Sequence, residues 1–428
     1  MFHSAPLQNL INGIDPIHTK SIQLRSGQLF QGRITQIYPN DLAQLRLGGL
    51  TLTAKLEAKI EKGRSYWFQV LDGDNGIPKL RVLEEVPVFP TKQGKNAIIK
   101  QLGIPLGSHH EQLLHKLIKE NIPFTRENLR QGGDILQGIS LQRETMEEAV
   151  VQLLRRNFPI TKDTILSLQS LQANETIGGA LTKLERALRG ELQYRYPQLF
   201  EIISLLLQKS DWDAVNSSGL RGSMLLKDLF LMLGLNHESQ LNHALANNEM
   251  KKMETLKSLL LEMKPWDLPK SITNLREFLL HRITASQILS TPNEGPVQQV
   301  VVQFPVKFSK HYRDVTVQWE GRTLKNGQID EKHCRILFYM ELDHLLETIV
   351  DVQIQNRIVS LTIYNEHPKP VSINNQWHDI LRGKMRNLNY QFSTVKWIQS
   401  KGNETNTSST PALYGERHVN YRGVDVRI

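Results

Sequence analysis

Residues 29–56 read LFQGRITQIYPNDLAQLRLGGLTLTAKL, and this stretch carries the clearest structural signal in the chain. Its partly alternating apolar and polar runs are separated by a Pro-Asn-Asp turn and by a Gly-Gly pair. Two similar runs follow, at Tyr66–Leu71 and Lys79–Leu83. Such runs, bounded by turn residues, are typical of short β-strands. Five strands within residues 21–90 predict a small OB-like β-barrel, because closure removes exposed strand edges.

Barrels of this size include nucleic-acid binders that stack bases on aromatic side chains. The candidates for stacking are the aromatic residues Phe30, Tyr38, Tyr66, Trp67 and Phe68. Residues 1–90 hold ten Lys and Arg against eight Asp and Glu, however, which is a weak electrostatic footprint. The sequence therefore favours core and edge packing for these aromatics over base stacking.

The stretch 95–289 has the apolar spacing of amphipathic helices. Leu113, Leu114 and Leu117 share one predicted helix face, and Met146 and Val150 share another. We expect this helical region to follow the barrel. An N-terminal tail at residues 1–20 is expected to precede the barrel.

A short repeat lies within the helical region. Residues 121–129 match residues 157–165, an offset of 36, and each copy places a threonine, Thr125 or Thr161, before a helical pattern. Threonine at that point is a predicted N-cap. Ser108 is a third candidate cap in a looser copy. The repeat fits either a solenoid with a binding groove or stapled helix starts in a bundle, and two good copies favour the bundle.

A linker at 290–297 (STPNEGP and the following valine) precedes a region of alternating strands at 298–399, which contains one amphipathic helix at about 373–388. Residues 400–428 are predicted to be a flexible linker and C-terminal tail. The fold class expected is multidomain α+β: an N-terminal five-stranded β-barrel, a central helical region, and a C-terminal mixed β-sheet with one packed helix.

The segment Arg335–Ile398 resembles the C-terminal domain of the flagellar hook-length control protein family. The resemblance rests on a strand at Ile336–Leu342, an acidic turn at Asp343–Glu347, two alternating strands, and then the helix. Leu345-Leu346 replaces the family's Leu-Gly pair, and the turn lacks the family's proline. With a barrel and helices ahead of it, the arrangement is closest to the flagellar-hook-like proteins of Gram-positive spore formers.

The resemblance implies a non-enzymatic interaction protein. Its expected partner is the export-gate switch protein of a type III (flagellar) export apparatus, or a paralogue of that protein, and its expected effect is regulation of substrate switching. It also implies a cytoplasmic protein that is open to export by the flagellar route. The alternative function is a nucleic-acid-binding adaptor that uses the N-terminal barrel. A basic stripe with exposed aromatics on the barrel would favour nucleic acid, whereas an apolar patch on the C-terminal domain would favour a protein partner.

Composition and sequence motifs limit the kinds of partner, targeting segment and reactive site that the chain can have. The net charge of +9 is compatible with a nucleic acid, an anionic lipid or an acidic protein as partner. No cleavable signal peptide and no membrane-spanning segment are predicted. The single cysteine, Cys334, excludes an intramolecular disulfide, and its neighbour His333 should face the opposite side of a strand. His109, His110 and His115 are expected on the solvated surface.

The sequence contains no nucleotide-binding, zinc-protease or serine-hydrolase motif of the common types. We therefore predict neither an enzyme nor a cofactor nor a metal site.

The predicted partner-binding residues are Arg382, Lys384 and Arg386, on the helix near residue 380. The apolar stripe of that helix, which includes Trp377 and Met385, is expected to be buried on the sheet. The basic groups would then form either a solubilising outer face, which the sequence favours, or a docking site for an acidic surface.

Overall fold

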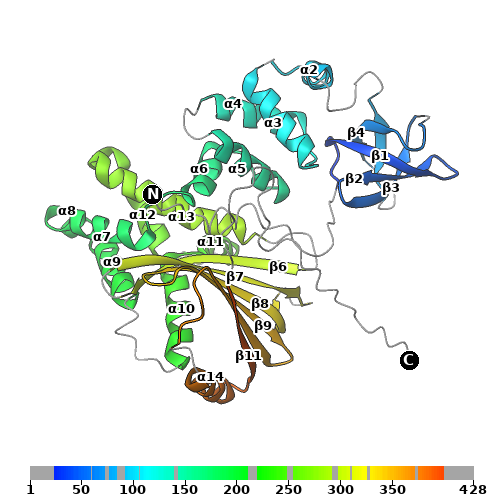
Figure 1. Ribbon diagram of the computed structural model, residues 1–428. Helices are drawn as coiled ribbons and strands as arrows, with labels where there is room; N and C mark the ends of the chain where they lie inside the picture. Colours follow the sequence, from blue (N-terminus) through cyan, green and yellow to red (C-terminus); the bar gives the residue numbers. More distant parts are fainter. Residues whose placement is uncertain are drawn as a thin grey trace.

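The computed structural model describes residues 24–58, 60–72, 77–83, 92–105, 107–138, 143–210, 219–247, 254–291, 297–308, 311–324, 328–371 and 375–399. It shows a β-barrel at one end of the molecule, a group of helices, and a large twisted sheet (Figure 1). The predicted tails at 1–20 and 400–428 lie outside the described residues.

The N-terminal barrel closes from five strands in the order β1-β2-β3-β5-β4, so the predicted barrel is confirmed. The strands are β1 (Leu29–Ile37), β2 (Leu42–Leu47), β3 (Leu50–Leu56), β4 (Ser65–Leu71) and β5 (Lys79–Val82). β3 pairs with β5 in parallel, and the other pairs are antiparallel. Phe30, Ile34, Leu45, Phe68 and Leu80 fill the interior. The alternation that predicted the strands thus places every second side chain in the core.

The middle of the chain is helical, as predicted. Its elements are α2 (Lys92–Gln101), α3 (Ser108–Lys119), α4 (Arg126–Gln137), α5 (Arg143–Arg155), α6 (Lys162–Ser170), α7 (Ile177–Leu188), α8 (Glu191–Arg195), α9 (Pro197–Lys209), α10 (Gly219–Leu233), α11 (His237–Ala246), α12 (Leu256–Glu262), the 3₁₀ turn η1 (Pro265–Asp267) and α13 (Lys270–Leu289).

Two predicted helix starts are confirmed. Thr125 caps α4 and Thr161 caps α6, and each hydroxyl accepts a hydrogen bond from the backbone N–H three residues on. The predicted cap at Ser108 is wrong, because α3 begins at Ser108 itself and Gly107 occupies the cap position. A cap needs extended backbone geometry, and here Gly107 takes it.

The barrel is joined to the helices by residues on its outer surface. Leu29 of β1 exchanges two backbone hydrogen bonds with Phe124, just before α4, at 2.7 and 3.1 Å. Trp67 of β4 is 2% exposed although it points away from the barrel interior, because its ring packs edge-on against Phe124 with centroids 6.3 Å apart. The barrel therefore shares apolar packing with α3, α4 and α5.

The C-terminal region forms one six-stranded sheet in the order β11-β10-β9-β8-β7-β6. The strands are β6 (Val297–Phe308), β7 (His311–Thr323), β8 (Ile329–Leu342), β9 (Leu346–Gln355), β10 (Ile358–Asn365) and β11 (Gln391–Gln399). β10 and β11 are parallel and joined through α14 (Asn375–Asn387), whereas the remaining pairs are antiparallel. The predicted mixed sheet is confirmed.

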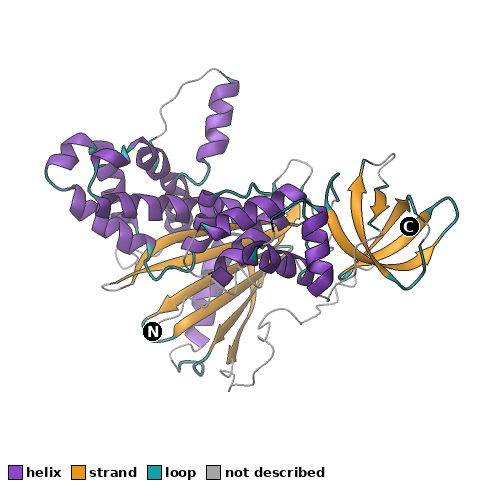
Figure 2. Ribbon diagram, turned by 90° about the horizontal axis from the view of Figure 1, so that it is seen from above, coloured by secondary structure: helices purple, strands orange, loops and turns teal. Residues whose placement is uncertain are grey.

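Helices cover the β6–β7 side of this sheet (Figures 1 and 2). α13 runs along β6 and contacts α6 and α7, while α7 packs on both β6 and β7. Two apolar clusters result, one shared by barrel, helices and Val301, the other by helices and the strand residues Phe304, Val306 and Val315. The core thus continues across the predicted linker, of which residues 292–296 lie outside the described residues.

The expectation for His110 is wrong. Its side chain is 4% exposed, and it lies between α3 and α4, 3.4 Å from a carboxylate oxygen of Asp134. Gly133 makes room for the ring, since a Cβ atom there would stand 2.1 Å from His110 Cδ2. The close helix approach that glycine allows is a tertiary feature with no local signal.

Candidate functional site

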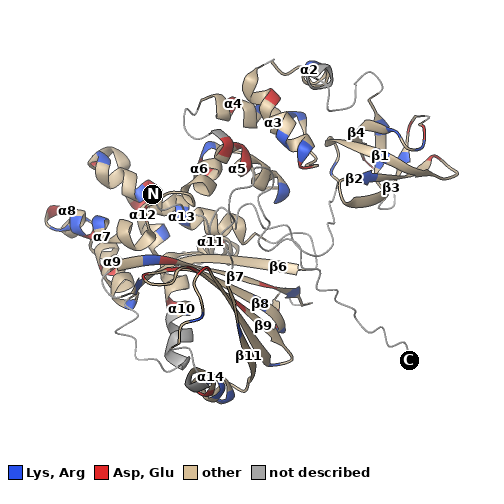
Figure 3. Cartoon of the chain, viewed as in Figure 1, with Lys and Arg blue, Asp and Glu red and all other residues tan. Residues whose placement is uncertain are grey.

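The three predicted partner-binding residues lie on α14, at the bottom of Figure 3. Arg382, Lys384 and Arg386 are all exposed. Arg382 forms a loose ion pair with Asp379, at 3.9 Å, and both side chains are more than half exposed. Lys384 and Arg386 lie in the last turn, where positive charge interacts favourably with the helix dipole. The solvated position of all three basic groups is confirmed.

The apolar stripe of α14 is not buried as predicted. Trp377 is 53% exposed, Ile380 47% and Leu388, just beyond the helix, 44%, while Leu381 and Met385 are half-buried. The reason is the position of α14, which packs chiefly on β11, and β11 is the last strand of the sheet. One flank of the stripe is covered and the other overhangs the edge of the sheet.

Two local features fix α14 against the sheet. The ring of His378 packs on Phe392 of β11, with centroids 5.2 Å apart and planes at 63°. At the end of the helix, Asn389 adopts a left-handed φ of 62°, and Gln391 then donates its backbone N–H to the carbonyl of Arg357, at 2.8 Å. The helix therefore packs on β11 and leads directly into that strand, whose first residue is bonded to the β9–β10 turn.

We call Trp377, Ile380, Leu388 and the three basic residues together the α14 face. It combines apolar side chains about half exposed with a group of cations. Exposed apolar groups rimmed by polar residues are typical of surfaces that bind another protein. The C-terminal region thus exposes three large apolar side chains on or next to one helix.

In the barrel, the prediction of core packing for the aromatics is confirmed at Phe30, Trp67 and Phe68, each 2% exposed or less. These three rings therefore offer no stacking surface. Tyr38 differs, because it is 40% exposed in the turn between β1 and β2, where its hydroxyl donates to Gln36 at 2.6 Å.

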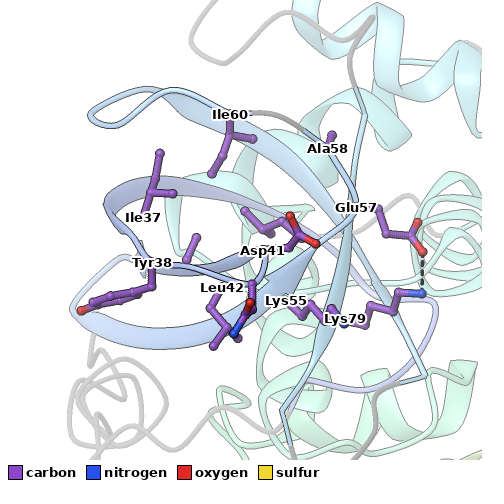
Figure 4. Close-up of a pocket in the computed structure, with 12 residues that line it drawn as sticks. Ile37, Tyr38, Asp41, Leu42, Lys55, Glu57, Ala58, Ile60 and Lys79 are labelled. Atoms are coloured by element: carbon purple, nitrogen blue, oxygen red, sulfur yellow. Dashed lines mark ion pairs between the residues drawn. The ribbon is translucent and has the colours of Figure 1, made fainter.

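Beside Tyr38 the barrel holds an open cleft of about 960 Å³ (Figure 4). Its lining residues are Ile37, Tyr38, Asn40, Asp41, Leu42, Ala43, Lys55, Leu56, Glu57, Ala58, Ile60 and Lys79. Sequence reasoning missed this cleft. The available signal was the turn at 39–41, since two consecutive residues, Asn40 and Asp41, take positive φ values of 63° and 59° to turn the chain around its mouth.

Some of the charged side chains that line the cleft form ion pairs with one another or with a neighbouring residue. Glu57 lies 2.8 Å from the ammonium of Lys79 and 3.3 Å from Arg81. The hydrogen bond from Lys79 lowers the pKa of the Glu57 carboxyl, so that this group stays charged and paired. Lys55 also lines the cleft, and its exposed side chain lies outside this ion-paired group.

The single thiol lacks the surroundings that a nucleophile needs. Cys334 is 8% exposed, and burial raises its pKa, which disfavours the reactive thiolate. His333 is exposed and bonds Asp330 at 3.0 Å, on the other side of the strand. Within the described residues, no group of three or more potential ligand side chains could hold a metal ion.

Comparison with known proteins gives one partial match. The chain is 28% identical over 117 residues to the uncharacterized protein YlqG of Bacillus subtilis (strain 168). The match covers 27% of this chain and 20% of that protein, so the chain matches about a fifth of its relative. No protein family model matches, and no solved structure matches. In the described part of the chain, no helix combines the length and apolar character needed to cross a membrane.

Proposed function

We propose that this chain is a non-enzymatic interaction protein that binds a component of a type III (flagellar) export apparatus through the α14 face and regulates substrate switching. The expected component is an export-gate switch protein or a paralogue of it. The proposal combines the resemblance of Arg335–Ile398 to hook-length control proteins with the geometry of the α14 face.

The observation that carries the proposal is the uncovered flank of α14. An exposed tryptophan is the side-chain type most enriched at the centre of protein interfaces. Trp377 supplies it here, with Ile380 three residues on and Lys384 one turn further along the same side of the helix, while Arg382 and Arg386 lie around the helix from them. The basic residues would act mainly on the association rate with an acidic partner, and the apolar residues on the lifetime of the complex.

The test measures binding of the full-length chain to the cytoplasmic domain of an export-gate switch protein from the same organism, by biolayer interferometry at low salt. The variant is Arg382→Glu/Lys384→Glu/Arg386→Glu. The matched control, Arg33→Glu/Arg46→Glu/Lys55→Glu, reverses the same number of exposed charges on the barrel.

We expect the α14 variant to keep its melting temperature and to associate at least tenfold more slowly, since like charges would then oppose encounter. The barrel control should associate at the wild-type rate. No binding by the wild-type chain, or an equal loss in both variants, would refute the proposal.

A further inference from the structure

The outer surface of strands β1, β2 and β3 carries basic side chains close to one another. Arg33 of β1 stands directly opposite Arg46 of β2 in the strand register, and both are exposed. Like charges in directly opposed positions destabilise a strand pair. Arg33 donates its Nε to the carbonyl of Gly63 at 3.0 Å, and Arg46 donates its Nε to the carbonyl of Gly48 at 2.8 Å. Among the residues that the structure describes, neither arginine forms an ion pair with a carboxylate.

Lys55 extends this row to the cleft. It is the register partner of Leu42 at the other end of the β2–β3 hairpin, and Arg46 lies four residues further along β2. Strand geometry separates the two positions by about 13 Å. The other outward residues along this stretch are Gln44, Thr51 and Thr53, which are polar and uncharged, and the half-buried Leu42 opposite Lys55. We call Arg33, Arg46, Lys55 and these three polar residues the β1–β3 face.

The β1–β3 face and the cleft join at Lys55, which belongs to both. At the cleft, Tyr38 presents an exposed ring, and Asn40 and Asp41 present amide and carboxylate groups. One surface therefore combines cations, an aromatic ring, and hydrogen-bonding groups able to meet the edge of a base.

We propose that the β1–β3 face and its cleft bind single-stranded nucleic acid. The backbone phosphates lie along Lys55, Arg46 and Arg33, and a base stacks on Tyr38 at the mouth of the cleft. The row between the cations has no apolar centre of the kind that protein interfaces need, whereas nucleic-acid interfaces are polar and positively charged. The 13 Å row fits the few nucleotides that one barrel of this type contacts.

The experiment titrates the full-length chain into fluorescein-labelled 15-residue oligo-dT and oligo-rU and follows fluorescence anisotropy at several salt concentrations. Three phosphate contacts on a single strand predict a slope of about −2 for log K against log salt. In Arg33→Ser/Arg46→Ser the affinity should fall at least tenfold and the slope should become shallower by about 1.4. This variant relieves the repulsion between the arginines, so it should fold.

The matched control is Arg382→Ser/Arg386→Ser on α14, which removes the same charge and should leave oligonucleotide binding unchanged. Tyr38→Ala should weaken binding of the oligonucleotides but not of a labelled polyglutamate peptide. Absence of binding at the lowest salt, or equal weakening by the control, overturns the proposal. Polyglutamate binding as tight as that of the oligonucleotides, with no effect of Tyr38→Ala, also overturns it and assigns the surface to an acidic protein.

Discussion

The guanidinium of Arg282, on α13, lies 3.5 Å from a carboxylate oxygen of Asp314, on β7, and both side chains are buried. Both carboxylate oxygens of Asp314 also accept from the backbone N–H of Ile177, the first residue of α7, at 2.9 Å. Arg282 in turn donates to Gln303 of β6 at 3.1 Å and to the carbonyl of Glu175 at 2.9 Å. Two helices and two strands thus meet at one ion pair.

Asp314→Ala should strongly destabilise the chain. Burial raises the pKa of Asp314 and lowers that of Arg282, so each charge depends on the other for compensation. Removing the carboxylate leaves a buried cation and takes away the acceptor of the first backbone N–H of α7, at a cost of roughly 3–5 kcal/mol in the free energy of unfolding. Urea denaturation followed by circular dichroism measures this cost.

The control for that variant is Asp343→Ala. Asp343 lies 3.4 Å from Arg313, but both side chains are about one-third exposed. Solvent screening limits such a pair to about 0–1 kcal/mol. If the two substitutions lowered the free energy of unfolding equally, the Arg282–Asp314 pair would stabilise the fold no more than an exposed ion pair does.

Acid should weaken the fold through His281. Burial lowers the pKa of this histidine below its ordinary value of 6.5, although Asp163 and Glu277 oppose the shift, and its Nδ1 lies 3.1 Å from the hydroxyl of Ser167. Below about pH 6.5 the unfolded chain binds a proton that the folded chain resists, so stability is lost as the pH falls towards the folded-state pKa.

Melting temperatures measured between about pH 7 and about pH 5 test this prediction. His281→Gln should reduce the loss of melting temperature over that interval, whereas the exposed His344→Gln should leave it as in the wild type. An unchanged pH profile for His281→Gln would contradict the assignment.

Trp67→Ala should loosen the joint between barrel and helices without unfolding the barrel. Trp67 packs on Phe124 outside the barrel, whereas its neighbour Phe68 fills the interior. Each truncation should lower the free energy of unfolding by roughly 3–5 kcal/mol. Trp67→Ala removes packing between the barrel and the helices, whereas Phe68→Ala removes packing inside the barrel. Hydrogen exchange should accelerate at the Leu29 and Phe124 amides in Trp67→Ala, with the β2–β3 hairpin still protected.

In Phe68→Ala, by contrast, protection should fall in all five barrel strands, because the cavity lies at their common core. The same exchange pattern in both variants would contradict the separation between barrel interior and joint.

Trp377→Ser should separate stability from binding. Because Trp377 is 53% exposed, its replacement should change the free energy of unfolding by no more than about 0.5 kcal/mol. Affinity for the export-gate protein should fall about 30-fold, which corresponds to about 2 kcal/mol at an interface centre. Phe392 belongs to β11 and is covered by α14, so Phe392→Ala should instead lower the free energy of unfolding by about 3 kcal/mol. A large loss of stability in Trp377→Ser would mean that the exposed flank of α14 is structural.

The sequence by itself determined the local elements. All five barrel strands and the caps at Thr125 and Thr161 follow its patterns. These features depend on neighbours within a few residues, so a linear pattern contains all the information needed to predict them.

Only the tertiary structure decided which outward faces are covered. Trp67 points out of a barrel and is buried, because α3 and α4 dock there; Trp377 belongs to an amphipathic stripe and is exposed, because the sheet ends at β11. Alternation and helical periodicity identify the apolar face of an element but not the element that packs against it. Arg33 and Arg46 come to lie opposite each other only through the register of β1 and β2, which is fixed when the chain folds. The burial of His110 likewise depends on how closely α3 and α4 approach each other.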